Sequence, residues 1–423
     1  MRIQLAWTMA IELLVMISGV LLLKVAASVL GPVGFGEYAL SRRAIGLMYL
    51  PLVLGLGIAA PRYIAIARSG ATDGFTESAF VTATLTAGLI PPGLLIVLLN
   101  VAPVTAALLL FGDSNLSRLV PPATVALGGI ALHSMLYAVY RGRSEMRFAN
   151  ALQFLNIGLV PLVAFALSPR DAAAVLLATG IGWLMISAVA LLHVLITERR
   201  NWDGVGVMQR HLKVLLRFGV PRVPGEFALV GLFAIPSLLA VREHGVVVAG
   251  QFSAAMSLLT IASGAFAPIG LVVLPRASAQ AAAGDIAGVR QLVLKILAGG
   301  ILLATVGVVV GELLIPAFIE WYFGAAFLPA IPIFRACLLG TVPYVVYILM
   351  RNVLDALDVK AVNTRNLLIA LGLVVGLCLV NTSILWMAFS LVASLLVLGV
   401  LTLRDTFTRL RLVHGGEAIP VAA

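Results

Sequence analysis

The sequence is poor in charge, since only 11% of its 423 residues are Asp, Glu, Lys or Arg and 61% are hydrophobic. Soluble domains carry about a quarter charged residues, so this composition excludes a soluble protein. It also excludes intrinsic disorder, because the chain can bury more apolar surface than ordering it would cost. With a mean hydropathy of +1.11, the composition is typical of a protein that crosses a membrane many times.

Cysteine and nucleotide-binding motifs are scarce as well. The two cysteines, Cys337 and Cys378, lie in apolar stretches and offer neither a disulfide framework nor the spacing of a metal site. No Gly-Lys pair occurs anywhere, which excludes a Walker phosphate loop, and there is no HExxH motif. We therefore expect no metal, no cofactor and no direct use of ATP.

Basic residues outnumber acidic ones, with 28 Lys and Arg against 18 Asp and Glu. A protein that binds nucleic acid would gather such cations on one soluble face. Here they stand in short groups between apolar runs. We expect no nucleic-acid partner, and we read the cations as signals of membrane topology.

Apolar runs of about 20 residues or more, bounded by Gly, Pro and charge, predict transmembrane helices. The strict alternation that a membrane β-barrel requires is missing, so an all-α polytopic membrane protein is predicted. The first run contains Glu12 and Lys24 and has the length of a span, which favours a retained helix over a cleaved signal. The spans number twelve and cover residues 5–30, 38–67, 77–111, 116–140, 146–168, 172–197, 212–241, 247–280, 289–316, 327–352, 360–381 and 383–403.

The distribution of cations among the loops predicts the orientation. With the amino terminus inside, the loops and span ends on that side hold 20 of the 28 Lys and Arg residues. Cytoplasmic loops carry such an excess. We therefore expect both termini, and the longest polar connection at 198–211, on the cytoplasmic side.

That connection also divides the chain into two similar halves. We expect a six-helix lobe at 1–200, a linker at 201–211, a second six-helix lobe at 212–404 and a tail at 405–423. At an offset of 214, GPVGFGEY (31–38) falls on GVVVAGQF (245–252), and seven identities lie between residues 31 and 67. Because each half has an even number of spans, a pseudo-twofold axis along the membrane normal is predicted to relate the two lobes.

Five cations lie too deep in the predicted spans to be loop residues. They are Lys24, Arg42, Arg43, Arg222 and Arg335. A charge at the middle of the bilayer costs about 2.5 to 3.5 kcal/mol on insertion scales. Such residues either snorkel to the interface or face a hydrated cavity that binds a ligand.

The repeat distinguishes cations that have a counterpart in the second half from cations that do not. Pro61-Arg62 falls on Pro275-Arg276, so we assign these two pairs to scaffold and gating roles at the cytoplasmic ends of their spans. Arg42 and Arg43 have no counterpart in the second half, where Met256 and Ser257 stand. We therefore assign the unduplicated cations to substrate binding.

The seventh span contains FGVPRVPGEF, in which Pro221 and Pro224 flank Arg222 and must kink the helix. Arg222 and Glu226 are four residues apart, so they form either a local ion pair or a polar element that faces a cavity. Glu12, Glu226 and His133 are the candidates for ion coupling. For His133, a hydrogen-bonded packing role is the alternative.

Two pairs of motifs carry a resemblance to a known family: LGPVGFGEYAL followed by APRYIAIA, and VAGQFSAAMSLL followed by LPRASAQ. With them, the sequence resembles the polysaccharide-biosynthesis flippases of the multidrug/oligosaccharidyl-lipid/polysaccharide exporter superfamily. The resemblance implies a bacterial inner-membrane flippase that carries undecaprenyl-diphosphate-linked oligosaccharide for O-antigen or exopolysaccharide synthesis. It also implies membrane lipid, a polysaccharide polymerase and chain-length machinery as partners.

Two rival classes remain open. A drug or cation antiporter of the same superfamily would need acidic residues in its cavity, where the predicted spans offer Glu12, Glu226 and Glu312 against the five cations. A polysaccharide polymerase or ligase would need a large loop outside the cytoplasm to carry its catalytic residues. The longest loop here is expected inside, so we predict a transporter and not an enzyme.

The topology predicts how two introduced cysteines will react in intact cells once Cys337 and Cys378 are replaced by serine. A membrane-impermeant maleimide should modify Asn115→Cys, which is expected outside. It should leave Val205→Cys unmodified, because the linker is expected inside. Efficient labelling at position 205 in unbroken cells would contradict the orientation.

Overall fold

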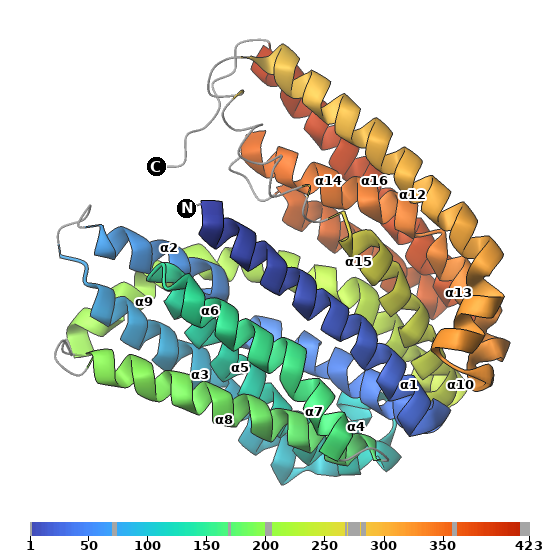
Figure 1. Cartoon of the computed structure of the whole chain (residues 1–423), viewed down its shortest axis with the longest axis horizontal. Helices are drawn as coiled ribbons and strands as arrows, with labels where there is room; N and C mark the ends of the chain where they lie inside the picture. Colours follow the sequence, from blue (N-terminus) through green and yellow to red (C-terminus); the bar gives the residue numbers. More distant parts are fainter. Residues whose placement is uncertain are drawn as a thin grey trace. The chain divides into compact units, whose positions relative to one another are not determined.

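The computed structural model describes residues 2–69, 74–167, 171–198, 205–266, 269, 280, 285–357 and 362–414. Every regular element within these residues is helical (Figure 1). The elements are α1 (Arg2–Leu52), α2 (Leu56–Arg68), α3 (Glu77–Val101), α4 (Pro103–Phe111), η1 (Ser114–Leu119), α5 (Val120–Gly142), α6 (Met146–Gln153), η2 (Phe154–Leu159), α7 (Val160–Leu167), α8 (Ala172–Glu198), α9 (Val205–Gly219), η3 (Val220–Arg222), α10 (Val223–Gly264), α12 (Ile286–Tyr322), η4 (Ala325–Ala330), α13 (Ile331–Leu338), α14 (Thr341–Leu357), α15 (Val362–Val380) and α16 (Ile384–His414).

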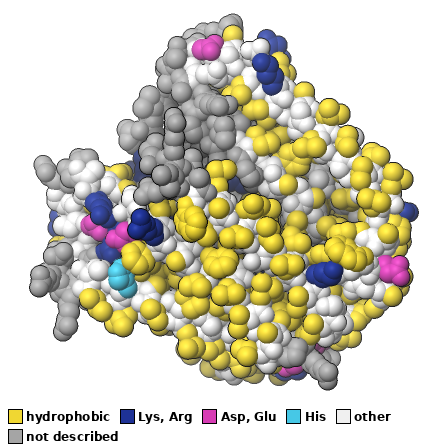
Figure 2. Space-filling model, in the orientation of Figure 1, with side chains coloured by type: hydrophobic (Ala, Val, Ile, Leu, Met, Phe, Trp, Pro, Cys, Tyr) yellow, Lys and Arg dark blue, Asp and Glu magenta, His cyan; other side chains and the backbone are white. Residues whose placement is uncertain are grey.

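Many of these helices are suited to cross a membrane. Nine of those within the described residues are long and apolar enough, and a tenth is added if the bent pair Ala325–Leu338 and Thr341–Leu354 forms one span. Figure 2 shows a broad hydrophobic surface interrupted by few charged side chains. The prediction of an all-α polytopic membrane protein is confirmed.

The chain forms two compact units, Met1–Phe227 and Ala228–Ala423, and the boundary falls inside α10. In the first unit, α5 is the central helix and packs against α2, α3, α6 and α8. Its Tyr140 is buried in a core that extends from Phe80 on α3 to Leu215 on α9. The first unit therefore extends beyond the expected linker and includes α9, which packs against α2 and α3.

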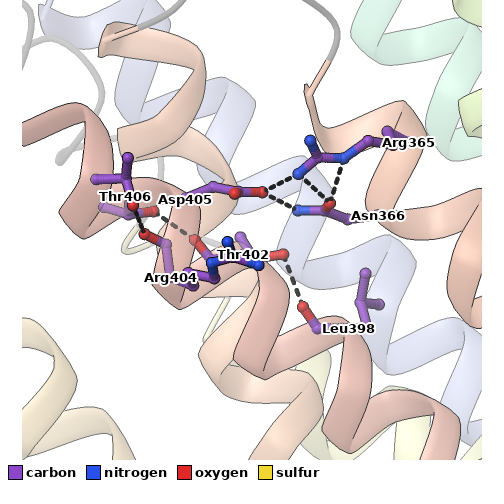
Figure 3. A network of polar contacts seen from close by, with 8 residues as sticks. Arg365, Asn366, Leu398, Thr402, Arg404, Asp405 and Thr406 are labelled. Carbon is purple, nitrogen blue, oxygen red and sulfur yellow. Dashed lines mark hydrogen bonds and ion pairs between the residues drawn. The ribbon is translucent and has the colours of Figure 1, made fainter.

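The second unit is organised around α16, which packs against α13, α14 and α15. Tyr347 on α14 is among its largest buried side chains. Near the carboxyl end of α16, Asp405 accepts hydrogen bonds from Arg365 at 2.6 Å and from Asn366 at 2.8 Å (Figure 3). Asn366 is fully buried, so this network fixes α15 against α16.

Two glycines mark kinks at equivalent places in the sequence repeat. Gly31 has φ 64° and ψ −177° inside α1, and Gly245 has φ 73° and ψ 176° inside α10. Only glycine adopts this backbone conformation readily. The two positions are 214 residues apart, the offset found in the sequence, and each falls in a predicted gap between spans. The sequence repeat therefore coincides with a repeated kink of the backbone at Gly31 and Gly245.

A second pair of segments repeats the same order of local structures. Gly112 and Gly324, both with positive φ, follow Phe111 and Phe323 at the end of a helix. Each is followed by a six-residue 3₁₀-helix, η1 or η4, and then by an α-helix with proline in its first turn. Proline suits this position because its missing N–H would have no partner there.

The kink geometry predicts a stability difference between glycine substitutions in α1. Gly31→Ala should lower the free energy of unfolding by about 1 to 3 kcal/mol, because the added side chain strains the backbone at positive φ. Gly19→Ala is the matched control, since Gly19 has no positive φ and no atom near its missing Cβ. Thermal unfolding of the purified variants in detergent measures the difference. Equal melting temperatures for the two variants would contradict the strain.

Candidate functional site

Two guanidinium groups from different elements meet at the ring of Phe218, the penultimate residue of α9. The Arg222 Cζ lies 3.7 Å from the ring centroid, and the Arg62 Cζ, from α2, lies 4.8 Å from it. Tyr63 packs edge-on against the same ring at 5.6 Å between centroids. We call Arg62, Phe218 and Arg222 the Phe218 cluster.

The local sequence explains why Arg222 turns toward Phe218. Pro221 has no N–H and cannot continue the α-helical hydrogen bonds of α9, so the chain makes the short 3₁₀-helix η3. Arg222 then donates from Nη1 to the carbonyl oxygen of Phe218 at 2.6 Å. A carbonyl freed at membrane depth needs such a partner.

Close packing of two backbones brings α2 and α9 together. Gly55, with φ 69°, comes just before α2 and lies against Gly219 at the end of α9. A Cβ on Gly219 would lie 2.7 Å from the carbonyl oxygen of Leu54. The absence of a side chain at these positions therefore allows the contact that places Arg62 beside Phe218.

Within the described residues, neither Arg62 nor Arg222 forms an ion pair. The local pair between Arg222 and Glu226, one of the two alternatives from the sequence, is therefore not formed. Glu226 instead interacts electrostatically with Tyr49 on α1. The Phe218 cluster holds two positive charges that no described carboxylate neutralises.

Arg42 lines a separate cavity of about 190 Å³ in the first unit. Its guanidinium lies 5.7 Å from the ring centroid of Tyr38, and Tyr49, Thr179 and Trp183 add further polar groups to the lining. The Tyr49 hydroxyl also bonds Ser134 Oγ at 2.5 Å. The cavity combines aromatic walls with one cation, a lining suited to an anionic or hydroxyl-bearing group.

The other three predicted ligand cations have different surroundings. Lys24 and Arg43 are half-buried on α1, and both have interaction partners. Arg335 belongs to the second unit, where its Nε lies 3.6 Å from Glu312 Oε2 on α12. Of the five cations, four therefore belong to the first unit, and Arg335 has a carboxylate beside it.

The three ion-coupling candidates lie in the first unit. His133 is buried on α5, where it bonds Gln153 at 3.2 Å and Asn156 at 3.1 Å. Asn156 also donates to Ser187, and its own Oδ1 is buried without a partner. Asn156 belongs to the π-helix η2, and such helices often occur at functional sites.

Glu12 and the scaffold residues complete the predicted set. Glu12 interacts electrostatically with Tyr137, whose ring stacks on His133 at 5.9 Å. Pro61 lies within α2 where that helix packs closely on Gly142 of α5. Pro275 and Arg276 lie outside the described residues.

Two other arginines of the first unit form ion pairs with carboxylates, unlike Arg62 and Arg222 of the Phe218 cluster. Arg118 bonds Glu37 at 2.6 Å and Asp171 at 2.9 Å. Partial burial acts to raise the pKa of Asp171, but hydrogen bonds from Arg118, Ala174 and Ala173 outweigh it and hold the pKa below its ordinary value. The opposing charges give Arg118 a structural role.

Arg143 is the second ion-paired arginine and is almost fully buried. It bonds Glu77 at 2.7 Å and Thr197 at 3.3 Å, while Arg68 donates to its carbonyl oxygen at 2.6 Å. Breaking a buried ion pair by removing one partner is strongly destabilising. This pair therefore fixes α3 against α5.

The chain resembles a known protein family in sequence and known transporters in structure. The family model described as polysaccharide biosynthesis protein matches residues 4–280. An inward-facing multidrug resistance MATE family transporter of the MOP superfamily gives a TM-score of 0.77 at 15% identity, covering 94% of this chain and 96% of that one. An outward-facing structure of such a transporter gives 0.64 at 16% identity, with coverage of 98% and 96%.

A MOP superfamily transporter from Pyrococcus furiosus, described by the reverse polarity of its binding pocket, gives a TM-score of 0.64 at 14% identity, covering 97% of this chain and 94% of that one. At such identities the likenesses show the fold alone. No curated protein sequence gives a significant match. Within the described residues, no group of three His, Cys, Asp or Glu side chains is placed to hold a metal ion.

The contact between α2 and α9 predicts the effect of a single methyl group. Gly219→Ala should lower the melting temperature, since the added Cβ meets backbone, and such overpacking costs about 1 to 3 kcal/mol. Gly206→Ala in the same helix should not lower it, because no atom lies within 4 Å of its missing Cβ. If both variants unfold like the wild type, the close contact does not exist in solution.

Proposed function

Because the chain belongs to the polysaccharide biosynthesis protein family and has the fold of MOP superfamily transporters, we propose that it is a flippase for lipid-linked oligosaccharide. The substrate is an undecaprenyl-diphosphate-linked oligosaccharide, and the protein carries it to the outer leaflet of a bacterial inner membrane. Polysaccharide polymerase and chain-length machinery then act on the product. The chain itself makes and breaks no covalent bond.

The Phe218 cluster is the observation that carries this proposal. Arg62 and Arg222 have no carboxylate partner in the described structure, so their charges are available to an anion. Arginine offers a planar fork of donors that binds phosphate oxygens in pairs. We infer that the two arginines bind the diphosphate from the cytoplasmic side and that Arg42, in its own cavity, binds it later in the cycle. Lys24, Arg43 and Arg335 contribute secondary charge.

Alternating access supplies the movement. If α1 divides at Gly31 and α10 at Gly245, the ten candidate spans of the described residues become twelve. This number agrees with the proposed layout of six spans in each lobe and both termini inside. Rocking of one lobe against the other around the site would expose it to each side in turn. An inside-negative potential favours outward movement of the diphosphate by about 2.3 kcal/mol per charge per 100 mV. Protonation of His133, coupled to Glu12 or Glu226, is the candidate second driving force.

A drug antiporter is the second candidate, because two of the similar structures are multidrug resistance transporters. A cationic drug would be repelled by two unneutralised arginines, however. Pocket polarity also differs within the fold, as described for the Pyrococcus furiosus transporter. The charge of the Phe218 cluster therefore favours an anionic substrate over a cationic one.

Substitution of the cluster arginines tests the proposal in cells that lack their own flippase. Arg62→Gln/Arg222→Gln should reduce rescue of surface polysaccharide at least tenfold, since each charge-assisted hydrogen bond contributes about 1.5 to 3 kcal/mol. Arg222→Lys, which keeps the charge but loses the fork, should retain partial activity. Arg217→Gln removes an exposed charge from α9, the helix that carries Phe218, and should rescue normally.

Immunoblotting of membranes controls for the level of each variant. Normal rescue by the double variant at normal expression would disprove the role of the cluster. Efflux of a cationic drug by the wild type, without rescue of polysaccharide, would favour the antiporter.

A further inference from the structure

The second unit contains a cavity of about 480 Å³ between the start of α12 and the end of α16. These two helices contact each other and run side by side in Figure 1. The part of the lining that α12 provides includes Arg290, Gln291 and Leu294, and α16 provides Phe407, Leu410 and Arg411. Both helix ends lie on the side that the distribution of cations assigns to the cytoplasm.

The cavity is lined by apolar side chains and by guanidinium groups that share one face of each helix. Positions 290, 291 and 294 share one face of α12, and positions 407, 410 and 411 share one face of α16, because residues three and four apart are neighbours. Leu410 is buried, whereas both arginines are exposed. The cavity therefore combines an apolar part with guanidinium groups from two different helices.

The charge of the two arginines is not neutralised by the described part of the chain. Neither Arg290 nor Arg411 has an ion pair or a side-chain hydrogen bond there. Asp405 lies on α16 six residues before Arg411, but its carboxylate is bound to Arg365 and Asn366 on α15 (Figure 3).

The carboxylate nearest to Arg290 in the sequence is that of Asp285, which forms no ion pair within the described residues. Asp285 accepts a hydrogen bond from the backbone N–H of Gly288 at 2.8 Å and thereby caps the first turn of α12. Two like charges therefore line one cavity without a described counterion. An anion between them would relieve their repulsion.

We propose that this cavity binds a phosphate group, supplied by the headgroup of an anionic membrane phospholipid. The two arginines, which lie on separate helices, donate hydrogen bonds to the phosphate oxygens, and the Gln291 amide is a further, neutral donor. Leu294, Phe407 and Leu410 contact the first methylenes of the acyl chains. Basic pockets between membrane helices on the cytoplasmic side bind anionic headgroups in this way. The site lies in the second unit, so it does not depend on the proposed substrate or on the Phe218 cluster.

Native mass spectrometry of the purified full-length protein can test this site. The delipidated protein is mixed with phosphatidylglycerol or with zwitterionic phosphatidylcholine, and the bound lipid is counted. The wild type should retain phosphatidylglycerol in preference to phosphatidylcholine. Arg290→Gln/Arg411→Gln should reduce that retention at least tenfold, and Arg290→Lys/Arg411→Lys should have an intermediate effect because the charge remains but the planar fork is lost.

Lys295→Gln is the control for loss of a positive charge outside the cavity. It removes one exposed positive charge from α12 at a position that does not line the cavity, so retention should change less than twofold. Size-exclusion chromatography of each variant establishes that it is folded and monodisperse. A nonspecific attraction to charge would make the Lys295 variant resemble the arginine variants, and this result would overturn the proposal.

Competition with inorganic phosphate distinguishes the two sources of a phosphate group. Retention of phosphatidylglycerol in excess inorganic phosphate supports the lipid headgroup. Its displacement, together with binding of inorganic phosphate to the wild type but not to the double arginine variant, supports the same site with a soluble phosphate as its ligand. Retention of phosphatidylglycerol by the double arginine variant at the wild-type level overturns the proposal.

Discussion

A charged side chain within a membrane must find water, an opposite charge or the interface, and four arginines of the first unit meet this constraint in two different ways. Arg118 and Arg143 meet carboxylates across helices, and their charge is used to hold those helices together. Arg62 and Arg222 meet the ring of Phe218. An aromatic face attracts a cation but cannot neutralise it, so this second group remains able to bind an anion.

The position of the Phe218 cluster also depends on hydrogen bonding of the backbone and on close packing of helices. Pro221 interrupts the hydrogen bonding of α9, and the side chain of Arg222 satisfies the carbonyl oxygen of Phe218. Gly55 and Gly219 allow α2 and α9 to approach until Arg62 reaches the same ring. His211, which is buried and precedes Phe218 on α9, accepts a hydrogen bond from the backbone N–H of Thr76 and fixes α9 to the start of α3. The helix α9, which carries Phe218, is thus held to α2 by a close backbone contact and to α3 by a side-chain hydrogen bond.

Local features of the fold could be predicted from the sequence, because hydrophobic runs and glycines act over short distances. The gaps at 31–37 and 242–246 contain the kinks at Gly31 and Gly245. Contacts between distant helices could not be predicted in this way, since they depend on how each helix is rotated in the bundle. The sequence therefore placed Arg62 with the scaffold and gave no sign that Glu312 lies beside Arg335. The spacing of Phe218, four residues before Arg222, was the available signal for the cluster. Helix periodicity places these two residues on one face, but it does not show that Arg62 from α2 lies beside Phe218.

Direct binding to the purified protein tests most closely whether Arg62 and Arg222 bind the diphosphate of a lipid-linked substrate. Microscale thermophoresis can compare undecaprenyl diphosphate with undecaprenol, which has the same chain and no charge. We expect the wild type to bind the diphosphate at least tenfold more tightly than the alcohol, and we expect Arg62→Gln/Arg222→Gln to abolish this difference. Equal affinity of the wild type for both lipids, or an undiminished preference in the double variant, would show that the two arginines do not bind the diphosphate.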